Sequence, residues 1–161
     1  MSTPLLLAID IGKSGGLSWQ FESAILCEKM PPSESGVLEL LTDLKSLHDH
    51  GSSDSRNPPV AYVEKVSGFI GNAHPGSRMF NFGEGYGFVK GVLQCGGWRV
   101  VLVRPQEWQK ELGLFNKEKL SRNKWKNILK DEAKRLYPNQ KVTLATADSF
   151  LILEYGRRME L

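Results

Sequence analysis

The chain has 161 residues, of which 40% are hydrophobic and 24% charged, and its formal net charge at pH 7 is +3. These values predict a soluble globular protein, and the length suits a single domain over residues 1–161 with a full core. No apolar run approaches the ~20 residues of a membrane-spanning helix, and residues 1–4 lack the basic region of a signal peptide. Cys27 and Cys95 lie far apart without ligand spacing. We therefore interpret them as reduced thiols of a cytoplasmic protein.

The first predicted strand is an unbroken apolar run over residues 5–9, and it ends at Asp10. Such a run is typical of a central strand covered on both faces. Gly12, Gly15 and Gly16 follow and allow a sharp reversal. Alternating patterns over residues 17–21 and 24–29 then predict an antiparallel meander. A carboxylate at the end of a buried strand is costly unless it is paired or binds a metal, so Asp10 is the first candidate site residue.

The middle of the chain alternates helix and strand. Apolar residues at helical spacing predict a helix that starts near Ser33 or Ser35 and runs through Leu47. Residues 60–64 form a second apolar strand that ends on a carboxylate, Glu64. An irregular loop is expected over residues 65–78. A helix with glycines every four residues is expected over 80–97, and a strand over 98–103.

Three helices are predicted in the C-terminal third. Pro105 opens a short one, residues 117–136 form a basic one, and residues 146–159 form the last, with Asp148 in its first turn. The order of strands and helices along the chain predicts a mixed α/β fold.

Asp10, Glu64 and Asp148 are candidates for one shared site. If the strands that end at Asp10 and Glu64 are neighbours, these two acids meet at the end of the sheet, and the last helix can bring Asp148 to them. Three carboxylates at one point repel each other unless a divalent cation lies between them, and oxygen ligands suit Mg²⁺ or Mn²⁺. Each acid alone has a simpler reading, as the cap of a turn or as the partner of a helix dipole.

Basic and aromatic residues suggest a nucleic-acid surface. The excess of Lys and Arg over acids in residues 117–141 is typical of a solvated helix face and equally of a track for phosphates. Lys13 is interpreted as facing a nucleic-acid phosphate or solvent. Aromatic residues among cations can stack on unpaired bases, although Phe80 and Phe82 are expected to face the core. The segment concerned contains Phe69, Arg78, Met79, Phe80 and Phe82.

Five motifs together resemble the RuvC-like Holliday-junction resolvases: AIDIGKSG at 8–15, VEKV at 63–66, MFNFGEGYG at 79–87, PQEWQK at 105–110 and ADSFLILEYGRR at 147–158. The resemblance implies a ribonuclease H-like fold, with a five-stranded mixed sheet flanked by helices. It also implies a homodimer that binds four-way DNA junctions and nicks two strands symmetrically with Mg²⁺.

The resemblance also implies roles for single residues. Asp10, Glu64 and Asp148 would bind the metal, and Lys126 would be the active-site lysine, with Lys124 as its near competitor. Phe69 resembles an aromatic residue that family members press against bases at the crossover. The residues expected to contact DNA are Lys13, Lys65, Phe69, Arg78, Lys124 and Lys126.

One departure from the family pattern leaves a second function open. The family has a further acid a few residues before the acid of the last helix, and this chain has Thr143, Leu144 and Ala145 there. A catalytically impaired junction-binding protein is therefore the alternative to a nuclease. Residues 8–12 also resemble the nucleotide-binding lobe of actin-like proteins and sugar kinases. That fold needs two such lobes, and this chain has room for one.

Overall fold

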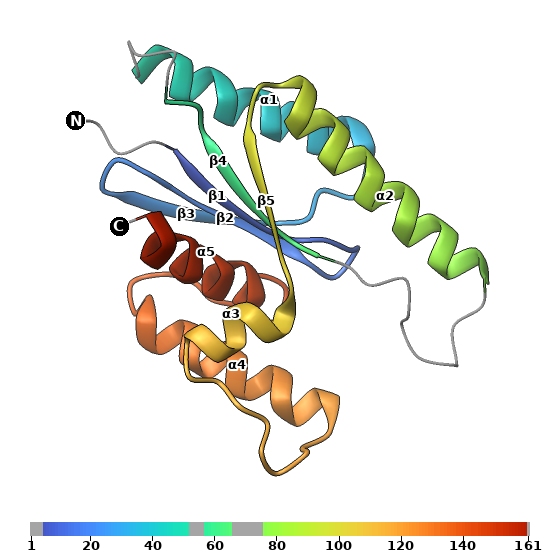
Figure 1. Cartoon of the computed structure of the whole chain (residues 1–161), viewed down its shortest axis with the longest axis vertical. Helices are drawn as coiled ribbons and strands as arrows, with labels where there is room; N and C mark the ends of the chain where they lie inside the picture. Colours follow the sequence, from blue (N-terminus) through green and yellow to red (C-terminus); the bar gives the residue numbers. More distant parts are fainter. Residues whose placement is uncertain (1–4, 52–56, 66–75, 161) are drawn as a thin grey trace.

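The computed structural model describes residues 5–51, 57–65 and 76–160, which form a mixed β-sheet with helices on both faces (Figure 1). The sheet order is β3-β2-β1-β4-β5, in which β1 is antiparallel to β2 and parallel to β4. The five strands are β1 (Leu6–Asp10), β2 (Gly16–Phe21), β3 (Ala24–Lys29), β4 (Val60–Glu64) and β5 (Arg99–Val103). This arrangement confirms the predicted meander and the five-stranded mixed sheet.

The helices form two layers, one on each face of the sheet. One layer contains α1 and α2, and the other contains α3, α4 and α5 (Figure 1). The bounds are α1 (Glu34–Gly51), α2 (Gly76–Cys95), α3 (Pro105–Glu111), α4 (Arg122–Leu136) and α5 (Ala147–Glu160). Within the described segments, no helix is both long enough and apolar enough to cross a membrane.

The central strand β1 is buried on both faces because its side chains alternate between the two layers. Leu5, Leu7 and Ile9 belong to the core shared with α1 and α2. Leu6 and Ala8 belong to the core shared with α5. Both faces are apolar, which explains why the strand appears in the sequence as an unbroken apolar run.

Parallel pairing of β1 with β4 brings two strand ends to the same edge of the sheet. Ile9 pairs with Val63, so that Asp10 and Glu64, the next residue of each strand, lie side by side. On the other side of β4, Glu64 pairs with Val103 at the end of β5. The carboxyl ends of β1, β4 and β5 therefore define the edge at which the candidate site lies.

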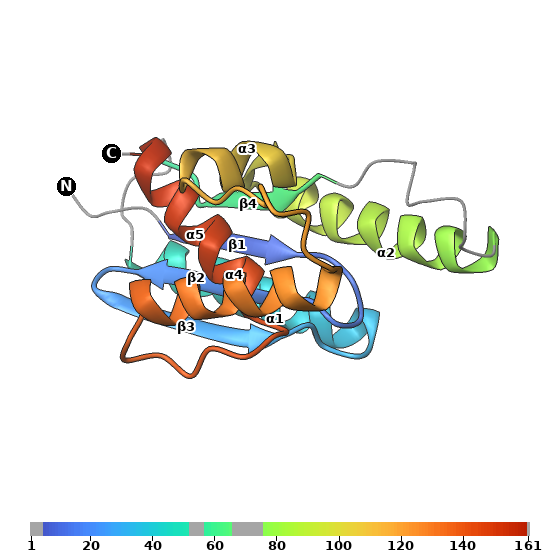
Figure 2. The same ribbon diagram turned by 90° about the horizontal axis from the view of Figure 1, so that it is seen from below.

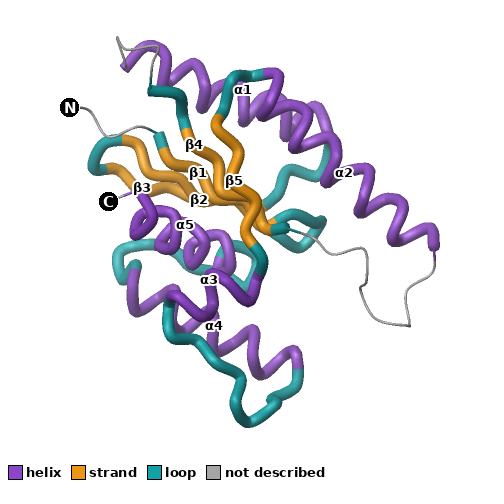
Figure 3. The backbone as a smooth tube through the Cα atoms, viewed as in Figure 1, coloured by secondary structure: helices purple, strands orange, loops and turns teal. Residues whose placement is uncertain are grey.

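Two helix boundaries differ from the sequence prediction. The basic helix begins at Arg122 and not at Lys117. The Asn116 side chain accepts a hydrogen bond from the Leu120 amide at 2.8 Å and donates one to the Leu120 carbonyl at 3.2 Å. Lys119 has a φ of 49°, which no α-helix tolerates. Figure 3 shows the resulting loop between α3 and α4.

The other boundary is the start of α2. This helix begins at Gly76, so that Arg78 lies in its first turn and not in a loop. The N-terminal half of α2 projects beyond the sheet (Figures 1 and 2). Phe80 is consequently 70% exposed, contrary to prediction, whereas Phe82 packs partly against the core with α1.

Close packing of α5 on the sheet depends on Gly156. A Cβ atom at this position would lie 2.9 Å from Cδ2 of Tyr62 on β4. We expect Gly156→Ala to lower the free energy of unfolding by about 1–3 kcal/mol, because the backbone of α5 must move away from the ring. The control is Gly85→Ala on α2, where a Cβ meets nothing within 4 Å. Urea unfolding of both variants checks this, and an equal loss in the two would contradict it.

Candidate metal centre

Asp10, Glu64 and Asp148 lie together at the carboxyl edge of the sheet. Asp10 and Glu64 end the neighbouring strands β1 and β4, and Asp148 lies in the first turn of α5, which packs across β1 and β2. One carboxylate oxygen from each residue lies within 4.8 Å of the others. The predicted gathering of the three acids is therefore present.

The turn after β1 fixes the backbone of Asp10. The Gly15 amide donates a hydrogen bond to the Gly12 carbonyl at 3.0 Å, and the Met30 amide donates one to the Gly15 carbonyl at 3.0 Å. A Cβ at Gly15 would lie 2.0 Å from the carbonyl oxygen of Asp10, so no other residue fits there. The glycine thus lets the chain reverse directly behind the acid.

The two carboxylate oxygens of Asp148 differ in their contacts. Lys126 on α4 forms an ion pair with Oδ2 of Asp148. The Asp148 side chain is 6% exposed, and Oδ1 is the one buried side-chain oxygen or nitrogen without a hydrogen-bond partner in the described part of the chain. A buried charged oxygen without a partner is costly, so this atom marks where a ligand fits.

The donor set fits a hard divalent cation. Three carboxylates face one ammonium group, which leaves a surplus of negative charge at the site. Oxygen ligands of this kind suit Mg²⁺ and Mn²⁺, whereas zinc and copper sites rely on histidine and cysteine. Asp10, Glu64 and Asp148 are therefore the residues that could hold such an ion.

Burial and mutual repulsion change the proton affinity of the acids. Burial, followed by the charges of Glu64 and Asp148, raises the pKa of Asp10 well above its usual value. Burial also raises the pKa of Glu64, although the hydrogen bond from Trp108 lowers it in part. Burial lowers the pKa of Lys126, but the nearby acids, led by Asp148, outweigh burial and the net shift is upward. The lysine therefore keeps its positive charge.

These shifts predict how the stability of the metal-free protein depends on pH. Acids with a raised folded-state pKa contribute stability that is fully present below their unfolded-state pKa of ~4. That stability is lost as the pH rises through the higher folded-state pKa. The raised pKa of Lys126 has no effect in this range, because lysine stays charged in both states. Metal-free protein is thus expected to be more stable at about pH 5 than at about pH 8.

Thermal unfolding with EDTA at the two pH values checks this expectation. Asp10→Asn should weaken the dependence of this stability on pH, because it removes one repelling charge. At about pH 8 the metal-free variant should be more stable than metal-free wild type by about 0.5–2 kcal/mol. A wild-type protein whose stability falls from the lower to the higher pH value by no more than that of the variant would contradict the assignment.

A cleft of about 1750 Å³ opens at the centre, and most of its charged lining residues are basic. Lys13, Lys65, Arg78 and Lys126, all expected from the sequence to contact DNA, line it. Phe69 lies outside the described residues. Arg122, from the basic stretch interpreted as a possible phosphate track, also lines the cleft, and the sequence prediction missed three further basic residues there, namely Lys29, Arg104 and Lys110. Lys29 and Arg104 lie at or next to the ends of β3 and β5, where no charge excess marks them.

Comparison with known proteins connects this arrangement to a known architecture. A scan against models of protein families found no match, and a search of curated proteins found none. The structure of RuvC from Thermus thermophilus aligns with a TM-score of 0.57 at 15% identity, covering 97% of this chain and 96% of that one. T. thermophilus RuvC in complex with Holliday junction substrate aligns with a TM-score of 0.56 at 15% identity, covering 98% and 96%. The chain has the ribonuclease H-like fold of RuvC.

At 15% identity the likeness to RuvC extends to the fold and not to the activity. The shared fold accounts for the sheet order and for the packing of the last helix across β1 and β2. Thr143, Leu144 and Ala145 line the cleft just before α5, and none of the three carries a carboxylate. Among the described residues, the acidic cluster contains three carboxylates.

The phase of α4 separates the two candidate lysines. Arg122, Asn123, Lys126 and Asn127 line the cleft, whereas Lys124 does not. Residues two apart on a helix point about 200° apart at 3.6 residues per turn, so that Lys124 and Lys126 cannot share a face. Lys126 is thus the lysine that the fold brings to the acids, and a contact of Lys124 with DNA remains a prediction.

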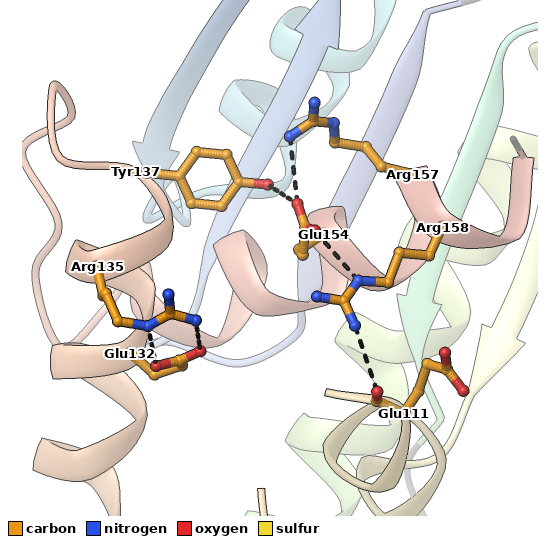
Figure 4. A network of polar contacts seen from close by, with 7 residues as sticks. All are labelled: Glu111, Glu132, Arg135, Tyr137, Glu154, Arg157 and Arg158. Carbon is orange, nitrogen blue, oxygen red and sulfur yellow. Dashed lines mark hydrogen bonds and ion pairs between the residues drawn. The ribbon is translucent and has the colours of Figure 1, made fainter. Parts of the chain in front are cut away.

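A polar network joins the three helices on this face of the sheet (Figure 4). Glu154 on α5 accepts hydrogen bonds from Tyr137, which follows α4, and from Arg157 and Arg158, each at 3.2 Å. Arg158 also donates a hydrogen bond to the Glu111 carbonyl of α3 at 3.4 Å. Burial raises the pKa of Tyr137 to about 12, so the phenol keeps its proton. The network thus fixes α4, which carries Lys126, relative to α5, which carries Asp148.

Proposed function

We propose that the chain is a metal-dependent endonuclease that cleaves four-way DNA junctions. The observation that carries this proposal is the cluster of Asp10, Glu64 and Asp148 with the unpartnered Oδ1 atom of Asp148. A basic cleft around an acidic centre suits a polyanion that must approach carboxylates. The likeness to RuvC bound to a Holliday junction supports the choice of a four-way junction as the substrate class.

The acids and the lysine take different roles in this proposal. Asp10, Glu64 and Asp148 would hold Mg²⁺ or Mn²⁺, which activates water and stabilises the leaving oxygen in phosphodiester hydrolysis. Lys126 ion-pairs with Asp148, so that its ammonium group lies next to the acids and can stabilise the negative charge that develops on the phosphate.

The cleft would hold the DNA through its backbone. Lys13, Lys65 and Arg78 line the cleft and are proposed to contact phosphates, with Lys124 contributing from outside it. Phe69 is proposed to stack against bases. Binding through several phosphate contacts weakens steeply as the salt concentration rises. Salt-sensitive binding is therefore part of the proposal.

The test is incubation of the protein with a synthetic four-way junction and, separately, with a linear duplex of the same sequence. We expect paired nicks in the junction in the presence of Mg²⁺ or Mn²⁺ and none with EDTA. Equal cleavage of the linear duplex would contradict the proposed preference for four-way junctions. Absence of cleavage with either metal would overturn the nuclease assignment.

A junction-binding protein without activity is the second candidate, and Ala145 is the observation that favours it. This residue and its neighbour Leu144 line the cleft in the stretch where the resemblance implies a further acid. Tight, salt-sensitive binding of the junction without nicking at any Mg²⁺ or Mn²⁺ concentration would identify this function. An Ala145→Asp variant that gains cleavage would show that the missing acid is the cause.

Two identical sites would match two symmetric cuts, so we propose a homodimer. Gly83, Gly87 and Gly91 share one face of α2, and a Cβ at any of them would meet nothing within 4 Å among the described residues. This open face allows close approach of a second copy.

A substitution on that face tests the homodimer. Gly87→Glu is expected to halve the mass measured by light scattering, because the carboxylate would separate the two copies. Gly85→Glu, on another face of α2, is the control. A wild-type monomer at working concentration would contradict the dimer.

A further inference from the structure

The indole of Trp108 contacts one of the three acids. Trp108 lies on α3 and is fully buried, and its Nε1–H donates a hydrogen bond of 3.0 Å to Oε2 of Glu64. The ring belongs to the core between the sheet and α5, together with Val103 and Phe150. A ring held on its apolar faces cannot turn its N–H group elsewhere, so the direction of the bond is fixed.

The chemistry of the two groups makes this bond one-directional. The indole nitrogen is a donor without acceptor capacity, and an ionised carboxylate is an acceptor only. The bond therefore favours the ionised form of Glu64, which is the form that binds a cation. With Oε2 held by the indole, rotation of the carboxylate is restricted and Oε1 is left for a ligand.

The backbone places α3 directly at the acid. Val103 at the end of β5 pairs with Glu64, and its carbonyl accepts a hydrogen bond of 2.7 Å from the Lys65 amide. Arg104 follows, and its amide donates a hydrogen bond of 2.8 Å to the Glu107 side chain at the start of α3. The donor on Trp108 thus lies in the helix that follows the strand paired with the acid, five residues after Val103.

We propose that Trp108 is a positioning residue that orients the Glu64 carboxylate for a divalent cation. The proposal rests on the metal centre of the proposed function and adds a residue outside the three acids. Groups that hydrogen-bond to metal ligands fix their orientation, and their loss typically weakens metal binding by about 10–100-fold. A purely structural alternative exists, because any buried indole N–H needs an acceptor, and Glu64 is within reach.

The test is Mn²⁺ binding to the chain of residues 1–161, measured by titration calorimetry. Trp108→Phe keeps an aromatic ring in the core and removes the donor, and we expect the dissociation constant to rise about 10–100-fold. Trp98→Phe is the matched control, because Trp98 is a buried tryptophan in the core on the other face of the sheet. It should leave the dissociation constant unchanged.

Trp108→Phe in a Glu64→Gln protein distinguishes an effect on the orientation of the carboxylate from a general loosening of the core. In a Glu64→Gln protein, adding Trp108→Phe should weaken Mn²⁺ binding no further, because the indole acts through the carboxylate. A further loss of the same size in that background would overturn the proposal. So would a Trp108→Phe protein that binds Mn²⁺ as tightly as wild type.

The isostere β-(3-benzothienyl)alanine at position 108 keeps the double ring without the N–H, and covers the case in which Trp108→Phe fails to fold. We expect the same loss of Mn²⁺ affinity with an unchanged melting temperature in EDTA. Unchanged affinity would overturn the proposal. A wild-type protein that binds no Mn²⁺ would overturn both this inference and the metal centre, whereas tight binding by wild type and isostere alike would overturn this inference alone.

Discussion

Asp10→Asn is expected to lower the rate of junction nicking by roughly 10³-fold or more and to weaken Mn²⁺ binding. Asp10 ends the central strand between two neighbours, and one of its carboxylate oxygens lies within 4.8 Å of oxygens of Glu64 and Asp148. An amide in its place is neutral and offers a single acceptor oxygen. Metal ions contribute several kcal/mol to catalysis of this kind, and each ~1.4 kcal/mol is a tenfold change in rate.

Nicking of a labelled four-way junction and calorimetric titration with Mn²⁺ measure the two effects of Asp10→Asn. Asp49→Asn is the matched control, because Asp49 lies on α1 and pairs with Lys45, outside the acidic cluster. Gel-shift binding of the junction should change little in Asp10→Asn, since the basic cleft is intact. Equal nicking by wild type and Asp10→Asn would remove Asp10 from the mechanism.

Lys126→Met is expected to separate metal binding from cleavage. The substitution removes the ammonium group and keeps most of the aliphatic stem. The nicking rate should fall roughly 10²–10³-fold, the usual cost of losing one group that stabilises transition-state charge. Mn²⁺ should bind at least as tightly as in wild type, because a competing cation has left Asp148.

The control for Lys126→Met is Lys124→Met on the same helix. Lys124 does not line the cleft, so its substitution should weaken junction binding slightly and leave the nicking rate at saturation unchanged. Equal losses of rate in both variants would show that net charge, and not the position of Lys126, matters. A large loss of Mn²⁺ affinity in Lys126→Met would indicate that the lysine holds the acids together.

The strand patterns were sufficient to place Asp10 and Glu64 at the ends of two buried strands, whereas the five-stranded sheet was expected from the resemblance to RuvC-like resolvases. The unbroken apolar run before Asp10 marks a central strand, and the run before Glu64 marks another. The two acids were expected to meet on the condition that their strands are neighbours, and the parallel pairing of β1 with β4 meets that condition. The position of Asp148 in the first turn of the last helix was also correct, since the apolar run after it begins at once.

Other parts of the site depend on contacts that no local pattern encodes. The choice between Lys124 and Lys126 required the phase of α4, which is set by its packing on α5. The start of α4 was placed too early because an asparagine turn before it consists of residues that also suit a helix. No role was predicted for Trp108, because nothing in its neighbourhood along the chain indicates that its N–H group meets Glu64.

The acids and the basic residues of the candidate centre come from different layers of the fold. The acids belong to β1, β4 and α5, and α5 packs directly on β1, β2 and β4. Lys126 and Arg122 come from α4, which packs against α5 on the side away from the sheet, after a loop of residues 112–121. Changes in that loop can therefore shift Lys126 and Arg122 relative to a bound substrate while the three carboxylates stay in place. Substrate selectivity and the metal-binding acids can thus evolve separately.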